Sequence, residues 1–197
     1  VAWGIGEDLF TWRWKDGGGI NYEAGQLAES YTLSDDLSTL SVKIRSGVAF
    51  HKGYGTMTAD DVVHSYNKTN PMITPHSIAP SAANFASLFG KNPAVADGSN
   101  VNFVFENFDV AWVNNLMNTG GFVGVVIHSK KAFDENDETW AKENVVATGP
   151  YEVESWVRDD TAVFNAWDGH WEFPAPQARK VIVKAVPQNE VRIAGMQ

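Results

Sequence analysis

The sequence contains no cysteine among its 197 residues. This absence excludes disulfide bonds, zinc–thiolate sites and a thiol nucleophile. It does not decide the compartment, because a cysteine-free chain suits a secreted bacterial protein and a cytosolic one nearly equally well. Long apolar runs are also missing, since none approaches the roughly 18 to 20 residues that a membrane helix needs. We therefore expect a chain that does not itself span a membrane.

Basic residues are scarce. The chain has 15 Lys and Arg against 24 Asp and Glu, which gives a formal net charge of −9. A nucleic-acid partner would require clustered basic side chains, so none is predicted. Hydrophobic residues make up 44% and charged residues 20%, as in ordinary globular proteins. The length suits one large domain or two small ones.

Motifs for metals, nucleotides and catalysis are absent as well. The glycine-marked loop Gly47–Gly55 lacks the Lys-Ser/Thr ending of a phosphate loop and the glycine spacing of a dinucleotide fold. Asp60 and Asp61 could act as an acid/base pair, but the start of a helix is sufficient reason for both. The histidines are scattered without metal-ligand spacing, and we expect each to be solvated or bonded locally: His51, His64, His76, His128 and His170. We predict no cofactor, no metal site and no catalytic residue.

Hydrophobic periodicity predicts a mixture of strands and helices. Ser41–Arg45 alternates polar and apolar side chains as a half-buried strand does, and Thr58 then opens a helix over about Ala59–Lys68. Asp109 is expected to cap a helix that extends to about Met117. A short helix is predicted at Ala82–Phe89, and further strands at Val101–Phe105, Phe122–Ile127, Tyr151–Val157, Thr161–Ala166 and Val181–Val186. The order indicates an α+β or mixed α/β fold, a mixed sheet with flanking helices and a largely antiparallel part.

Eight tryptophans are the most unusual feature of the composition. Flat aromatic rings can form stacking platforms for sugars or apolar groups. Most tryptophans nevertheless pack in cores or under loops, so we expect only one or two of the eight to face a ligand.

Two sequence blocks resemble a known family. The first runs from Leu27 to Tyr66 and includes the Leu-Ala-Glu-Ser, Arg-x-Gly-Val-x-Phe-His-x-Gly and Thr-Ala-x-Asp-Val patterns. The second contains Ala147–Tyr151, similar to Gly-Thr-Gly-Pro-Tyr, and Asn165–Trp171, similar to Arg-Asn-x-x-Tyr-Trp. In this order they resemble the peptide/nickel type (family 5) of extracellular solute-binding protein, the receptor component of bacterial ABC importers. Ala147 departs from the usual glycine, and Ile44 stands where leucine is common.

The resemblance implies a two-lobed periplasmic-binding-protein-like fold with a ligand cleft between the lobes. Residues 1–197 would form most of the N-terminal lobe, without its first strand and without the second lobe. The loop at Gly47–Gly55 would be scaffold. In relatives, two segments border the cleft: the loop after the capped helix, and the segment between the central helix and the next strand. They imply as ligand-binding candidates His76, Phe85, Thr119, Gly120, Gly121 and Phe122, and Trp3 near the start of the chain is a further candidate.

The resemblance also implies a function. The protein would capture a peptide or similar small solute at the periplasmic or extracellular face of the cytoplasmic membrane and deliver it to an ABC permease. It would be no enzyme, and a lipid anchor in the full-length protein is compatible with this role. Metal chelates, opines and oligosaccharides are alternative solutes, with peptide as the default because strand-like pairing is a general mode of recognition. Two other classes stay open: a carbohydrate-active or carbohydrate-binding domain that uses its tryptophans, and a free-standing interaction module.

Overall fold

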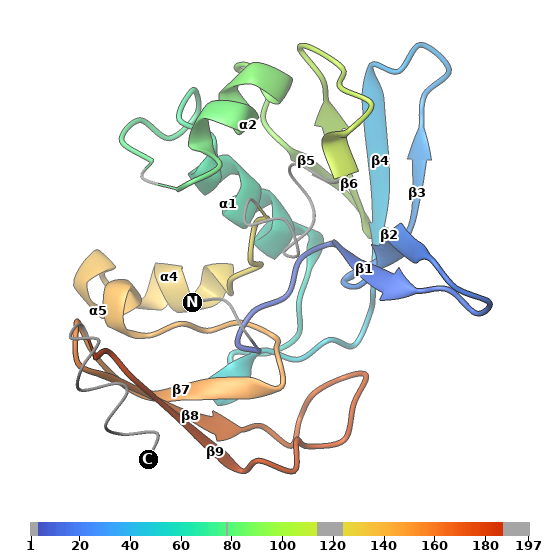
Figure 1. Ribbon diagram of the computed structural model, residues 1–197. Helices are drawn as coiled ribbons and strands as arrows, with labels where there is room; N and C mark the ends of the chain where they lie inside the picture. Colours follow the sequence, from blue (N-terminus) through green and yellow to red (C-terminus); the bar gives the residue numbers. More distant parts are fainter. Residues whose placement is uncertain (1–3, 78, 114–123, 187–197) are drawn as a thin grey trace.

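The computed structural model describes residues 4–77, 79–113 and 124–186, and its described strands form three antiparallel sheets (Figure 1). A hairpin joins β1 (Phe10–Trp14) to β2 (Ile20–Gly25). The four-stranded sheet has the order β3 (Ala28–Leu33), β4 (Thr39–Ile44), β6 (Asn100–Val104) and β5 (Val95–Asp97). The three-stranded sheet has the order β7 (Tyr151–Val157), β8 (Thr161–Ala166) and β9 (Lys180–Lys184).

The helices lie beside these sheets. In Figure 1, α1 and α2 flank the four-stranded sheet, while α4 and α5 lie between α1 and the three-stranded sheet. The bounds are η1 (His51–Gly53), α1 (Ala59–Thr69), α2 (Ala82–Phe89), α4 (Lys130–Glu135) and α5 (Glu138–Glu143). The α+β class with flanking helices is thus confirmed.

The four-stranded sheet follows from the alternation in β4. Leu40, Val42 and Ile44 are buried, while Lys43 points to solvent and pairs with Glu29. Because side chains alternate across a strand, the apolar half of β4 faces the helices as one continuous surface.

An aromatic cluster joins this sheet to α1 and α2. Tyr66 of α1 lies 4.8 Å from Phe103 of β6 and 5.6 Å from Phe85 of α2, measured between ring centroids. Phe89 lies 5.8 Å from Phe103. Offset and edge-on ring pairs of this kind stabilise a core beyond the effect of buried area alone. Phe85 and Phe89 lie four residues apart and so share one face of α2, the short helix that the sequence predicted.

Two expected elements differ from the structure or lie partly outside it. The strand predicted at Phe122–Ile127 is wrong over its described part, residues 124–127, which has no regular strand pairing. This segment instead runs beside the N-terminal chain, where the Ile127 N–H donates to the Glu7 carbonyl at 3.0 Å. For the helix after Asp109, residues 114–117 lie outside the described residues; the Asp109 carboxylate accepts from the Ala111 N–H at 2.8 Å.

Asp61 fixes the start of α1 and joins it to α4. Its Oδ2 accepts from both the backbone N–H and the hydroxyl of Thr58, each at 2.8 Å. Its Oδ1 accepts from the backbone N–H of Lys130, the first residue of α4, at 2.7 Å. One carboxylate therefore satisfies donors at the N-termini of two helices, and the structural interpretation of Asp61 suffices.

We predict that Asp61→Ala lowers the free energy of unfolding by about 2 to 3 kcal/mol, because buried donors at two helix starts lose their acceptor. Asp60→Ala is the matched control: its carboxylate is exposed in the same turn, and its loss should cost only a few tenths of a kcal/mol, about the value of a helix-dipole contact. Urea denaturation of both variants measures the difference. Equal costs would contradict the role given to Asp61.

Candidate functional site

His51 joins the two sequence blocks that resemble the family, although its partners lie 96 and 98 residues away in the chain. Its ring is fully buried, and its Nε2 donates to the Gly149 carbonyl at 2.8 Å. Its Nδ1 accepts from the Ala147 N–H at 3.4 Å, and its backbone N–H donates to the Ala147 carbonyl at 3.0 Å. The ring also meets Trp167 edge-on at 4.7 Å. The histidine of the first block thus holds the second block in place.

The electrostatics of His51 agree with this bonding. One ring nitrogen donates and the other accepts, which is the pattern of a neutral imidazole. Burial lowers the pKa of His51 to about 4, although the hydrogen bond to Gly149 and the charge of Glu7 act in the opposite direction. His51 is therefore neutral at physiological pH and serves as a structural bridge.

A second bridge joins the N-terminal segment to the end of the second block. Glu7 is buried, and its carboxylate accepts from Gln26 at 3.1 Å, from His170 at 3.2 Å and from the Trp171 indole at 2.9 Å. The guanidinium of Arg45 lies over the Trp171 ring, 4.4 Å from its centroid. The expectation that the histidines are solvated or bonded locally is wrong for His51 and His170, because both are buried and bond to residues far away in the sequence.

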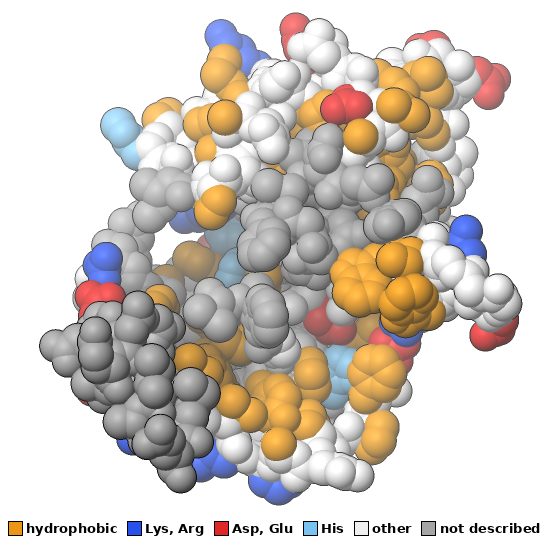
Figure 2. Space-filling model, viewed as in Figure 1, with side chains coloured by type: hydrophobic (Ala, Val, Ile, Leu, Met, Phe, Trp, Pro, Cys, Tyr) orange, Lys and Arg blue, Asp and Glu red, His pale blue; other side chains and the backbone are white. Residues whose placement is uncertain are grey.

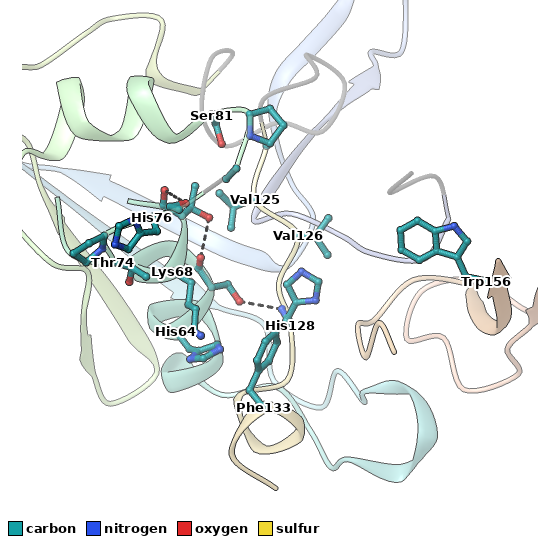
Figure 3. Close-up of a pocket in the computed structure, with 17 residues that line it drawn as sticks. His64, Lys68, Thr74, His76, Ser81, Val125, Val126, His128, Phe133 and Trp156 are labelled. Carbon is teal, nitrogen blue, oxygen red and sulfur yellow. Dashed lines mark hydrogen bonds between the residues drawn. The ribbon is translucent and has the colours of Figure 1, made fainter. Parts of the chain in front are cut away.

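A cleft of about 990 Å³ opens between α1, the loop that follows it and the three-stranded sheet. Figure 2 shows histidine side chains inside a hollow between the upper and lower halves of the molecule. The described lining consists of 17 residues, including Thr74–Ser77 and Ala79–Ser81 of the loop and Gly124–Val126. Trp156 of β7 lines the cleft, and Figure 3 shows it across from the loop. The volume of the cleft suits a small solute.

A ladder of hydroxyl groups shapes one wall of the cleft. Ser77 donates to the Thr69 carbonyl at 2.9 Å, Thr69 donates to the Ser65 carbonyl at 3.0 Å, and the Ser65 hydroxyl accepts from the His128 N–H at 2.9 Å (Figure 3). These bonds tie the loop and residues 124–128 to α1. Since these hydroxyls are engaged within the protein, the wall is held in shape before any solute arrives.

The seven predicted ligand-binding residues are divided by the structure. His76 lines the cleft with an exposed side chain and a backbone φ of 71°. Phe85 lies in the core, 1% exposed, and is not among the cleft-lining residues. Trp3, Thr119, Gly120, Gly121 and Phe122 lie outside the described residues.

Sequence reasoning missed several cleft residues. His64 and Lys68 lie four residues apart on α1 and so share one helix face, a signal that was present in the sequence. Trp156 is 52% exposed, so it is the kind of tryptophan that was expected to face a ligand. Its position opposite the loop depends on the packing of β7, which no local pattern predicts.

The protein resembles known proteins over nearly its whole length. Residues 24–197 match the family described as bacterial extracellular solute-binding proteins, family 5, Middle. The chain is 25% identical over 186 residues to the dipeptide-binding protein of Escherichia coli (strain K12), covering 87% of this chain and 34% of that protein. It is 28% identical over 178 residues to the glutathione-binding protein GsiB of Shigella boydii serotype 4, covering 87% of this chain and 31% of the relative.

Solved structures share the fold. MoaA from A. tumefaciens R10, in complex with mannopinic acid, superposes with a TM-score of 0.76 at 24% identity, over 98% of this chain and 37% of that one. A dipeptide-binding protein from Pseudoalteromonas sp. SM9913, in complex with Met-Leu, gives 0.74 at 20% identity, over 100% of this chain and 40% of that one. The chain spans about a third of the length of the curated relatives it matches.

The fold of this chain is thus shared with about two fifths of each of these longer solved proteins. The chain belongs to the bacterial extracellular solute-binding proteins of family 5. In the part of the chain that the structure describes, no helix is both long enough and apolar enough to cross a membrane.

We predict that His51 makes folding sensitive to acid. Its folded pKa of about 4 lies below the ordinary histidine pKa of 6.5, so the unfolded chain binds a proton first as the pH falls. The contribution of His51 to the free energy of unfolding is complete above its unfolded pKa. It is lost as the pH falls from the unfolded to the folded pKa, by roughly 3 kcal/mol in total. The stability advantage of the native chain over His51→Gln should therefore shrink by that amount between neutral pH and pH 4.

Urea denaturation at a series of pH values measures this difference. His76→Gln is the matched control, because the exposed His76 ring has no such buried bonds and the variant should follow the native chain at each pH. An advantage over His51→Gln that stays constant with pH would overturn the assignment of a neutral bridge.

Proposed function

We propose that this chain is most of the N-terminal lobe of a solute receptor that captures peptides or similar small solutes outside the cytoplasmic membrane. The observation that carries the proposal is the family match over residues 24–197, a range that includes every described residue lining the cleft. The names of the relatives, dipeptide-binding and glutathione-binding, support a peptide or peptide-like solute.

The mechanism we propose is capture by closure. The cleft wall presents apolar surface from Val125, Val126 and Trp156, and its shape is held by the hydroxyl ladder. A solute on this wall stabilises a closed form only through contacts that the closed form adds, and a second lobe would supply them. The receptor then passes the solute to an ABC permease, in which a separate subunit uses ATP.

This role requires neither a catalytic residue nor a cofactor. Of the described acidic side chains near the cleft, Asp61 accepts hydrogen bonds at the starts of α1 and α4, and Asp134 pairs with the ammonium of Lys130. The comparisons favour solute binding and give no support to the carbohydrate alternative. The protein would act at the periplasmic or extracellular face of the membrane, in agreement with the family's description as extracellular.

Calorimetric titration tests the proposal directly. The complete gene product and the 197-residue chain are titrated in parallel with Met-Leu, with glutathione and with a mixed dipeptide pool. We expect micromolar or tighter binding by the complete protein and at least about tenfold weaker binding by the chain, because closure contacts would be missing. Absence of binding by the complete protein would overturn the proposal of a peptide receptor. Sub-micromolar binding by the chain alone would overturn the division into two lobes.

We predict that Trp156→Ala weakens solute binding by the complete protein about tenfold, because a half-exposed indole on the cleft wall loses its contact with the solute. Trp14→Ala is the matched control, since Trp14 is 72% exposed on β1 and is not among the cleft-lining residues. Calorimetry on both variants distinguishes the two positions. Unchanged affinity in Trp156→Ala would show that this wall does not meet the solute.

A further inference from the structure

The described lining of the cleft differs in charge from the rest of the chain. The sequence carries 24 acidic and 15 basic residues, yet the described lining contains Lys68, three histidines and neither Asp nor Glu. In an acidic protein this is a local reversal of sign. A cleft with low-dielectric walls focuses the field of such a group toward its interior.

Lys68 is the centre of this reversal. Within the described residues its ammonium has no carboxylate partner, unlike Lys43, Lys130, Lys131 and Lys180. Its Nζ instead lies 5.3 Å from the centroid of the Phe133 ring. A cation–π contact leaves most of the hydrogen-bonding capacity of an ammonium group unused.

Two imidazoles surround the same phenyl ring. The ring of His64 lies 5.0 Å from Phe133 and the ring of His128 lies 6.1 Å from it, measured between centroids. Figure 3 shows the three nitrogen-bearing side chains gathered at the lower end of the cleft. The Nε2 of His64 is buried and has no hydrogen-bond partner among the described residues. A polar atom left in this state is an exception that calls for a partner.

The surrounding charges do not neutralise the cluster of Lys68, His64 and His128. Burial, followed by Lys68 and Lys130, lowers the pKa of His64, while Asp134 and Asp61 act in the opposite direction. Burial, followed by His64, lowers the pKa of His128 to about 4. Asp61 is committed to Thr58 and to the Lys130 N–H, and Asp134 is paired with the Lys130 ammonium. The cluster therefore combines two neutral imidazoles with a lysine that pairs with no carboxylate among the described residues.

We propose that Lys68, His64 and His128 form an anion-binding corner that receives a carboxylate of the solute. This inference rests on the proposed function for the identity of the ligand. The rest of the solute would lie along Val125 and Val126 toward Trp156, where the wall is apolar. The cleft thus selects solutes that have an acidic end and an apolar body.

Binding in this mode is linked to protons. A carboxylate beside an imidazole favours its charged form and raises its pKa. The solute should therefore bind more tightly as the pH falls below neutral, for as long as its own carboxylate stays ionised.

The first test compares dipeptides as free acids with the same dipeptides as carboxyl-terminal amides, titrated into the complete gene product. We expect the free acids to bind at least about tenfold more tightly, and Lys68→Gln to remove that preference. Lys131→Gln is the matched control: Lys131 is exposed on α4, pairs with Glu135 and is not among the cleft-lining residues, so it should leave the preference intact. Equal binding of free acids and amides, or a preference for free acids that persists in Lys68→Gln, would overturn the proposal of an anion-binding corner.

The second test does not depend on the solute. The imidazole signals of His64 and His128, followed by NMR in the 197-residue chain, are titrated with pH in sodium trifluoroacetate, a carboxylate that stays ionised throughout, and in sodium chloride at equal ionic strength. We expect trifluoroacetate to raise both pKa values, and Lys68→Gln to reduce the effect. A rise in trifluoroacetate without any peptide binding would retain the anion-binding corner and reject the peptide receptor. No rise, in a protein that binds dipeptides, would reject the corner and retain the receptor.

Discussion

The structure depends on one imidazole that is kept neutral. His51 follows β4 in sequence, and its ring donates to Gly149 and accepts from Ala147 just before β7, the first strand of the three-stranded sheet. A charged ring could not accept, so the bridge exists only while burial holds the pKa of His51 low. The Glu7 bridge acts beside it: a buried carboxylate collects three donors from segments as distant as Gln26 and Trp171. Together the two bridges help to set the shape of the cleft, because they hold the three-stranded sheet, whose Trp156 lines it, against the segments that precede α1.

The two matching blocks of sequence acquire a physical meaning in this arrangement. Gly149 has no room for a side chain, because a Cβ there would lie 2.6 Å from the Gly4 carbonyl oxygen and from the Ile5 carbonyl carbon. The backbone of this segment is thereby pressed against the N-terminal chain, where the Gly149 N–H donates to the Ile5 carbonyl at 2.9 Å. The residues of the two blocks that bond to each other belong to the frame of the protein. Most of the described cleft-lining residues lie outside the blocks, and His64 and Ser65 stand at the end of the first.

Local patterns predicted the elements well and the site poorly, and the reason is physical. Period-two alternation at Ser41–Arg45 and the Thr58–Asp61 cap act over neighbouring residues, so the sequence reveals them directly. The same holds for the turn at Asp159, which joins β7 to β8.

The ring of His51 finds its partners about a hundred positions away, and no local rule distinguishes it from a solvated histidine. Phe85 was proposed as a ligand contact because it lies near a cleft-bordering loop; in the structure its face of α2 packs on Tyr66 and the core. Among the described cleft residues, His76 was named from the resemblance, and the four-residue spacing of His64 and Lys68 on α1 was a further local signal.

The imidazole bridge also has a mechanical consequence. Hydrogen bonds from both edges of a planar ring oppose sliding as well as separation of the two segments that His51 joins, the one after β4 and the one before β7. We therefore expect any large movement that admits or releases a solute to hinge outside this pair of segments.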